Sequence, residues 1–176
     1  MSVNSHFRGL TKAVKHYEAL LTEVSEEMFT QNPSDGAWSY SETLSHIFQA
    51  NLASLIAVEK CVIGTGVFSE KRTRWQVSAI LFFGRLPPGK FKAPKQIASM
   101  VKKLSREEAA NLIVKFKNRL TDLKNKVEKA DKYKRVKHPR LGLLNARQWF
   151  RFIEIHTKHH IRQLNRIKKE LRVANH

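Results

Sequence analysis

The stretch that decides the fold is residues 138–167, HPRLGLLNARQWFRFIEIHTKHHIRQLNRI. Read as a helix at ~100° per residue, its second half places His156 and His160 one turn apart on an otherwise apolar face. The opposite face carries the charged side chains that water favours: Arg151, Glu154, Lys158, Arg162 and Arg166. Two histidines at this spacing can chelate one metal ion, because the helix pitch brings their ring nitrogens together. The alternative for an isolated pair is two core histidines, each satisfied by a hydrogen bond.

The length predicts one domain spanning residues 1–176, long enough to bury a sizeable core. No apolar run approaches the ~20 residues needed to span a bilayer, so we expect no membrane partner. Residues 1–10 lack the apolar segment of a secretory signal peptide. The single cysteine, Cys61, excludes an internal disulfide and every multi-cysteine metal site. These features indicate a soluble, cytoplasmic protein.

The charge is strongly positive, with 33 Lys and Arg against 15 Asp and Glu, or +18 in total. Such a field attracts anionic partners, whether nucleic acid, acidic lipid or a carboxylated small molecule. The basic residues are spread along the chain, and they form no nucleic-acid recognition motif. We therefore expect no specific nucleic-acid partner. A non-catalytic protein that binds nucleic acid or another polyanion through its basic surface is the alternative to an enzyme.

Apolar periodicity, capping boxes and breaker residues predict four long helices. They are expected at residues 5–29, from the Ser39–Glu42 capping box to Val62, at 105–129, and from an Asn145 cap to Val173. Residues 64–104 between the second and third helices form a long connection, in which 75–83 has the composition of a short helix. Residues 129–139 are rich in Lys, Arg and Asp and predict a solvated linker.

Four amphipathic helices without an alternating strand pattern predict an all-α fold, a four-helix bundle with a long crossover connection. Inward-facing side chains of different helices meet inside such bundles and build metal sites there. His46 lies on the second predicted helix, while His156 and His160 lie on the fourth. Together they would supply three nitrogen ligands to one divalent ion.

Three motifs carry a family resemblance: Trp38-Ser39-x-x-Glu42-x-x-x-His46, His138-Pro139-x-x-Gly142, and Trp149-x-x-Phe152-x-x-x-His156-x-x-His159-His160-x-x-Gln163. They resemble the DinB/YfiT-like metalloenzyme superfamily, and within it a subgroup of short bacterial proteins of unknown function. The resemblance covers about a third of the chain, in the order and spacing that the family uses. Ile161-Arg162 stands where many relatives have a glycine before the glutamine.

The resemblance implies an up-down-down-up bundle and a three-histidine site for zinc, nickel or a similar divalent ion. The metal ligands carried over are His46, His156 and His160. Relatives with this fold include thiol S-transferases that use bacillithiol or mycothiol, and isomerases that act on thiol conjugates. The implied partner is a small-molecule substrate, either a thiol or an anion. A homodimer is left open.

Three neutral imidazoles leave coordination positions open, which favours a metal-dependent hydrolase or a thiol S-transferase. Two further residues are catalytic candidates. Glu42 lies one turn before His46, so its carboxylate could accept the second ring N–H of that ligand or move a proton; closing the capping box with Ser39 is the alternative. Gln163 lies one turn beyond His160, where it could orient a ligand or the substrate. His159 is turned ~100° away from His160 and is expected at the rim.

The crossover connection offers a cover for the site. Residues 75–92 contain four aromatic side chains that could wall a pocket, and Gly84 and Gly89 would let the segment move. Arg85 or Lys90 could then meet an anionic group of the substrate. We therefore expect this segment to lie over the three histidines: its aromatic residues are Trp75, Phe82, Phe83 and Phe91.

The charge generates a first test. We expect any binding of DNA to be indifferent to sequence and to weaken steeply as salt rises, because it would rest on counterion release alone. Titration of labelled duplexes of different sequence at several salt concentrations measures both properties. A footprint on one sequence that survives at physiological salt would favour a specific nucleic-acid-binding protein instead.

Overall fold

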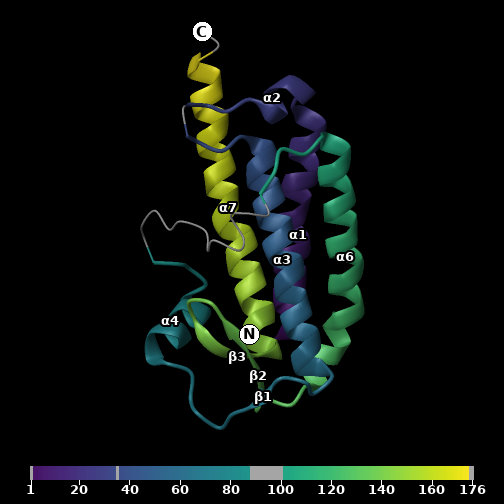
Figure 1. The fold of residues 1–176 in the computed structure, drawn as a ribbon, viewed down its shortest axis with the longest axis vertical. Coiled ribbons are helices and arrows are strands. Elements are labelled where there is room, and N and C mark those ends of the chain that lie inside the picture. The colour runs from purple at the N-terminus through teal and green to yellow at the C-terminus, as the bar shows by residue number, and fades with distance from the viewer. Residues whose placement is uncertain (1, 35, 88–100, 175–176) are drawn as a thin grey trace.

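The computed structural model describes residues 2–34, 36–87 and 101–174. Its four long helices are α1 (Val3–Glu23), α3 (Tyr40–Val62), α6 (Arg106–Lys129) and α7 (Ala146–Ala174). In Figure 1, α1 and α7 rise through the bundle, while α3 and α6 descend. This is the predicted up-down-down-up four-helix bundle, with the crossover joining α3 to α6. Among the described residues, no helix is both long and apolar enough to cross a bilayer.

The helix starts follow the predicted caps. Ser39 accepts a hydrogen bond from the backbone N–H of Glu42, whose carboxylate accepts one in return from the Ser39 N–H. Ser105 and Glu108 close the same reciprocal box at α6. Asn145 and Gln148 form the equivalent pair before α7. Each box satisfies backbone donors that the first helical turn otherwise leaves unpaired.

The apolar faces of the four helices meet in one core. Helix α7 packs against α1 and α3, and α6 packs against the same two helices from the other side. The largest fully buried side chains in this core are aromatic: Tyr17, Tyr40, Phe29, Phe48, Phe116 and Phe150. The neighbouring position of α3 and α7 is the one that the histidine spacing requires.

The first helix is shorter than predicted. Residues 5–29 were expected to form one helix, but α1 ends at Glu23, and Val24 takes an extended conformation with ψ 143°. Ser25 then caps a second, short helix α2 (Glu26–Thr30) by accepting a hydrogen bond from the Met28 N–H. The Ser-Glu-Glu run favours a new helix start over continuation, because serine competes with the helix for backbone groups.

The charged segment 129–139 is more than a solvated linker. It contains β2 (Lys134–His138), which pairs with the following strand β3 (Gly142–Asn145) and with β1 (Val67–Phe68) in a three-stranded antiparallel sheet. The prediction of a wholly helical fold misses this sheet. The alternation along β2 is carried by long basic side chains, and Arg135 is buried in spite of its charge. A basic strand of this kind has no apolar period to read.

The His-Pro-x-x-Gly motif makes the tight turn between β2 and β3. The Nδ1 atom of His138 accepts hydrogen bonds from the backbone N–H groups of Arg140 and Leu141, at 3.1 and 3.0 Å. Gly142 has φ +79°, a conformation that favours glycine. Burial and the nearby Arg140 charge lower the pKa of His138 to about 4, so its ring is neutral at pH 7. His138 is thus a structural partner in the Pro139 turn.

A buried ion cluster joins α1 to α7. The Glu154 carboxylate accepts hydrogen bonds from His6 at 2.7 Å, Arg151 at 2.6 Å and Lys158 at 2.5 Å. Burial by itself would raise the pKa of Glu154, but the bonds from His6, Lys158 and Arg151 outweigh it and lower the pKa to about 2. The stability that this carboxylate contributes is present above its unfolded pKa of ~4.3 and is lost as the pH falls towards 2.

Gly9 lets α1 approach this cluster, which generates a second test. A Cβ atom at Gly9 would lie 2.2 Å from Glu154 Oε1 and 3.0 Å from Lys158 Nζ. We expect Gly9→Ala to destabilise the protein by about 1–3 kcal/mol through overpacking, although Gly→Ala inside a helix ordinarily stabilises. In a Glu154→Ala background the same substitution should be neutral or stabilising. Urea unfolding of the four proteins measures this coupling, and equal effects in both backgrounds would contradict the clash.

Candidate metal centre

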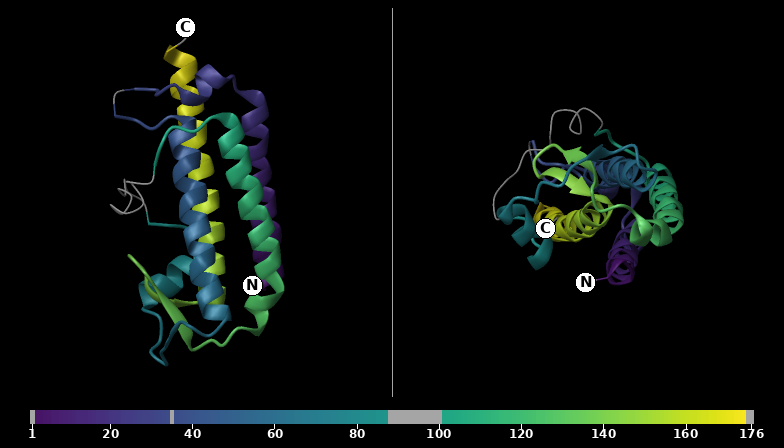
Figure 2. Two further views of the ribbon diagram at one scale, coloured as in Figure 1. Left: turned by 45° about the vertical axis from the view of Figure 1, so that its right-hand side comes forward. Right: turned by 90° about the horizontal axis from the view of Figure 1, so that it is seen from below.

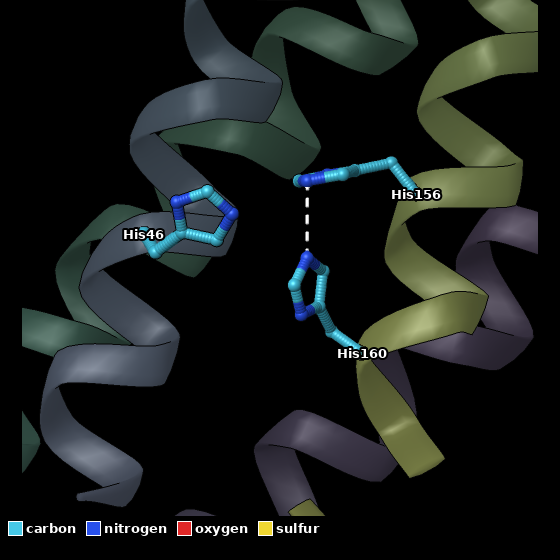
Figure 3. Close-up of side chains that lie close together, drawn as sticks. All are labelled: His46, His156 and His160. Atoms are coloured by element: carbon cyan, nitrogen blue, oxygen red, sulfur yellow. Dashed lines mark hydrogen bonds between the residues drawn. The ribbon is translucent and has the colours of Figure 1, made fainter. Parts of the chain in front are cut away.

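The structure brings the three predicted histidines together between α3 and α7. His46 lies in the second turn of α3, and His156 and His160 lie near the middle of α7. One ring nitrogen of each lies within 4.8 Å of the others. Figure 3 shows these nitrogens facing one gap between the two helices. All three residues are nearly enclosed, at 7, 8 and 9% exposure respectively.

A buried hydrogen-bond chain fixes the tautomer of His156. The Thr157 hydroxyl donates to the carbonyl of Ile153 and therefore accepts from the Asn51 side-chain amide, at 2.9 Å. This turns the Asn51 carbonyl oxygen towards His156 Nδ1, 2.9 Å away. The amide oxygen can only accept, so Nδ1 carries the proton of the neutral ring. The lone pair of His156 is consequently on Nε2, the atom that faces the other histidines.

Gln163 fixes the tautomer of His160. Its side-chain oxygen lies 2.7 Å from His160 Nδ1, and its amide nitrogen lies 3.5 Å from the hydroxyl of buried Thr43 on α3. The proton of the neutral His160 ring is thereby placed on Nδ1 as well. The Nε2 atoms of His156 and His160 face each other at 3.1 Å, the pair joined by the dashed line in Figure 3.

Burial keeps these rings unprotonated. It lowers the pKa of His46 to about 4, and it lowers that of His156 well below the usual value, with the neighbouring His160 and His46 adding to the effect. Burial and the nearby His46 likewise bring the pKa of His160 to about 3, against the opposing hydrogen bond of Gln163. At pH 7 the site therefore presents three neutral imidazoles, the form that binds metal ions.

The donor set fits a divalent metal ion. Two lone pairs that face each other at 3.1 Å need a cation or a proton between them, and burial disfavours the proton. Two imidazole ligands of a tetrahedral zinc ion stand about 3.3 Å apart, given Zn–N bonds of ~2.0–2.1 Å. The Nδ1 atom of His46 is buried without a hydrogen-bond partner among the described residues. His46 is therefore the histidine whose orientation depends most on packing.

Aromatic rings enclose the histidines. Trp38 packs against His46 with ring centroids 5.3 Å apart, and Phe152 stacks on His156 at 5.6 Å. Phe152 in turn contacts His138 of the strand turn at 4.4 Å, which links the sheet to the site. His159 contacts the outer side of the cluster through His160, with ring centroids 5.2 Å apart, and it is half-buried. This matches the predicted rim position of His159.

The structure places the Glu42 carboxylate in the cap of α3. One of its oxygens accepts hydrogen bonds from the Ser39 N–H and hydroxyl and from the Asn32 side chain, at 2.7–3.0 Å. Burial would raise the pKa of Glu42, but the bonds from Ser39 and Asn32 and the charge of Lys103 lower it. The capping function is thus present, and the catalytic role of Glu42 stays a prediction. So does the role of Gln163 towards a substrate.

The predicted lid is wrong for helix α4 (Trp75–Phe83). This helix packs on α7 through Leu81, whose carbonyl accepts a hydrogen bond from Arg151 at 2.9 Å. Arg151 precedes His156 by five positions, which places it ~140° around α7 from the histidine face. Three aromatic side chains expected to wall the site are 72–76% exposed instead: Trp75, Phe82 and Phe83. The rest of the predicted lid, residues 88–92 with Lys90 and Phe91, lies outside the described residues.

Asn51, Thr157 and Tyr17 were not identified from the sequence. The Tyr17 hydroxyl donates to the carbonyl of Thr157 at 2.5 Å, so α1 also supports the turn of α7 that carries His156. Asn51 and Thr157 are both fully buried. A buried asparagine on the apolar α3 was the available signal, since such a residue needs hydrogen-bond partners inside the core.

Comparison with known proteins identifies a matching family model and a distant relative. The family model described as the DinB superfamily matches residues 10–164. An uncharacterised protein of Bacillus subtilis strain 168, YuaE, is 23% identical over 154 residues, which cover 88% of this chain and 91% of that protein.

Two solved structures share the fold. YfiT from Bacillus subtilis, described as a probable metal-dependent hydrolase with an unusual four-helix bundle topology, superposes with a TM-score of 0.63 at 12% identity. The match covers 96% of this chain and 87% of YfiT. The four-helix bundle protein TT2238 superposes with a TM-score of 0.61 at 19% identity, covering 93% of this chain and 98% of that one. At these identities the likeness concerns the fold alone.

Asn51 generates a third test. Replacing it by leucine removes the acceptor that holds the proton on His156 Nδ1, so we expect Asn51→Leu to lower the affinity for a divalent ion by roughly 10–100-fold. Asn51→Asp keeps an acceptor at this position and should retain binding. Ser54→Ala is the matched control. It removes another buried polar side chain of α3, a hydroxyl that donates its hydrogen bond to the Ala50 carbonyl. Titration with Co²⁺ measures the metal affinity of the three variants. Wild-type affinity in Asn51→Leu would contradict the proposal that Asn51 positions His156.

Proposed function

Because the chain belongs to the DinB superfamily and places three neutral histidines around one gap, we propose that it is a metal-dependent enzyme. The metal ligands are His46, His156 and His160. Zinc or nickel is the proposed ion, since both accept imidazole ligands. The observation that carries the proposal is the facing pair of lone pairs on His156 and His160, which a divalent cation satisfies.

A divalent ion held by three imidazoles supplies open positions at which a water or a low-molecular-weight thiol is made more acidic, the chemistry of hydrolysis and of thiol transfer. The residues of the chain prepare the place for it. Asn51 and Gln163 hold the ring protons of His156 and His160 away from the gap. Trp38 and Phe152 keep bulk water from the rings, which strengthens every electrostatic interaction inside the site.

The proposed substrate is a small thiol or an anionic molecule. The +18 charge of the chain draws anionic molecules towards it, among them thiols that carry carboxylates. Gln163 is half-buried at the edge of the site, so its amide is the group placed to orient a substrate once it has oriented His160. Glu42 would take part in proton transfer through Oε1, because the bonds from Ser39 and Asn32 all end on Oε2. Addition of a small thiol to the Co²⁺-loaded protein tests whether the metal accepts a thiol, because a sulfur ligand gives a new absorption band.

The fourth test measures metal binding. We expect the purified, untagged protein to contain about one equivalent of divalent metal. Substituting His46, His156 or His160 by Ala should each lower the affinity by about tenfold or more, because each substitution removes a direct ligand. Metal analysis and Zn²⁺ competition titrations give the stoichiometry and the affinity.

His159→Ala is the matched control, since it removes an imidazole from the residue next to His160 and should retain the metal. A protein in which His159 is essential and His160 is dispensable would refute the assigned ligand set. A protein that binds no divalent ion at all would favour the alternative of a non-catalytic polyanion-binding protein.

A further inference from the structure

One end of the bundle exposes an unusual concentration of apolar side chains. Eight large apolar residues are exposed in the described part of the chain, and six of them lie between positions 63 and 83. They are Ile63 (65% exposed), Val67 (63%), Phe68 (58%), Trp75 (76%), Phe82 (74%) and Phe83 (72%). Single exposed apolar residues are ordinary, but a group of six in one segment indicates a binding surface.

The fold gathers this segment at the end of the bundle that carries the sheet. Strand β1 pairs with β2, and the Thr73 hydroxyl accepts hydrogen bonds from Arg135 and Gln148, at 3.2 and 2.8 Å. The next residues form α4, which is tied to α7 at Arg151. Figures 1 and 2 show α4 and the three strands together at this end, opposite the C-terminus. We call the six residues, with their supporting elements, the sheet-end surface.

Helix α4 is apolar on nearly all sides, with the sequence WQVSAILFF, yet Val77 is its one buried residue. Trp75 and Phe82 are seven residues apart and so share a face to within ~20°. Phe83 contacts Phe82 with ring centroids 5.2 Å apart. Contact with an apolar partner would stabilise a short helix of this composition, because its exposed aromatic rings would then be removed from water.

The same end is strongly basic. Residues 60–87 and 130–145 contain ten Lys and Arg against Glu70 and Asp131. Four of the basic side chains flank α4 and are exposed: Lys71, Arg72, Arg74 and Arg85. Basic residues beside exposed tryptophan and phenylalanine match the two layers of an anionic membrane surface, which are charged headgroups above acyl chains.

Other occupants fit less well. A second copy of the chain would bring ten basic side chains against ten others, and like charges across an interface oppose association. Single-stranded nucleic acid uses aromatic faces on which bases stack. Here Phe82 and Phe83 pack edge to face at 86°, and Ile63 and Val67 offer no ring.

We propose that the sheet-end surface docks the protein on an anionic lipid membrane. Trp75, Phe82 and Phe83 enter the boundary between headgroups and acyl chains, and the flanking Lys71, Arg72, Arg74 and Arg85 contact the phosphates. The attachment is peripheral and needs no spanning helix. It revises the expectation of no membrane partner, which considered spanning segments only, and it gives the +18 charge a role independent of the metal centre.

The fifth test uses the full chain and lipid vesicles. We expect the protein to float with vesicles that contain phosphatidylglycerol, to bind them less as salt rises, and not to bind phosphatidylcholine vesicles. The double substitution Phe82→Ser/Phe83→Ser should lower the affinity by at least tenfold, because it removes the apolar area that the two phenylalanine rings would bury in the membrane. Val114→Ser, at a 51% exposed residue of α6, is the matched control and should bind as the wild type does. Phe82, Phe83 and Val114 are all exposed, so their substitution leaves the core intact. Circular dichroism checks that the variants fold.

Tryptophan emission provides a second readout. The emission should shift to the blue on binding, and the shift should vanish in Trp75→Phe, because Trp149 is already buried and Trp38 packs on His46 away from this surface. No binding to anionic vesicles at low salt, or equal binding by the double variant, overturns the proposal. A dimer in sedimentation velocity that the double variant dissociates would assign the surface to a second copy and overturn it also. Oligonucleotide binding that depends on Phe82 and Phe83, without vesicle binding, would overturn it in favour of nucleic acid.

Discussion

Two unprotonated nitrogens, Nε2 of His156 and Nε2 of His160, lie 3.1 Å apart inside the interface of α3 and α7. The rest of the site depends on this contact. Their other ring nitrogens are committed to Asn51 and Gln163, so neither ring can turn its proton into the gap without losing a buried hydrogen bond. A divalent cation stabilises the two facing nitrogens, since it accepts both lone pairs and leaves the hydrogen bonds to Asn51 and Gln163 intact.

The bundle is arranged so that this contact is held from several directions. Tyr17 of α1 bonds to the carbonyl of Thr157, and the Glu154 cluster ties α1 to the opposite side of α7. The strand turn reaches the site through His138 and Phe152. Helix α7 is therefore fixed by α1, α3 and the sheet at successive turns, which limits its rotation about its own axis. A ligand pair on one helix needs this rigidity, because a small rotation would point both rings away from His46.

Features with a local cause could be predicted from the sequence. The capping boxes at Ser39 and Ser105 mark helix starts with residues that touch each other, so α3 and α6 begin where expected. The i, i+4 spacing of His156 and His160 fixes their shared face for the same reason. The position of His46 on the second predicted helix supplied the third histidine, and the family resemblance then supplied the up-down-down-up order of the helices.

Features that depend on distant pairing could not be predicted in this way. The strand Lys134–His138 gains its partners from residues 67–68 and 142–145, and its own basic side chains give no strand period. The break at Val24 and the exposed position of α4 depend on what packs against them. Asn51 is identified only when Thr157 and His156 are seen on the facing helix, 106 and 105 positions away. Polar residues that support a site from a second helix are thus the part that a single sequence shows least.

The three-histidine metal site is tested most directly by anomalous X-ray diffraction from a crystal of the zinc-loaded protein, recorded on both sides of the zinc absorption edge. We expect one strong anomalous peak in the gap between α3 and α7, bonded to nitrogen atoms of His46, His156 and His160, with the Asn51 and Gln163 contacts preserved. A peak at His159 or elsewhere on the surface, or a gap without anomalous signal at saturating zinc, would contradict it.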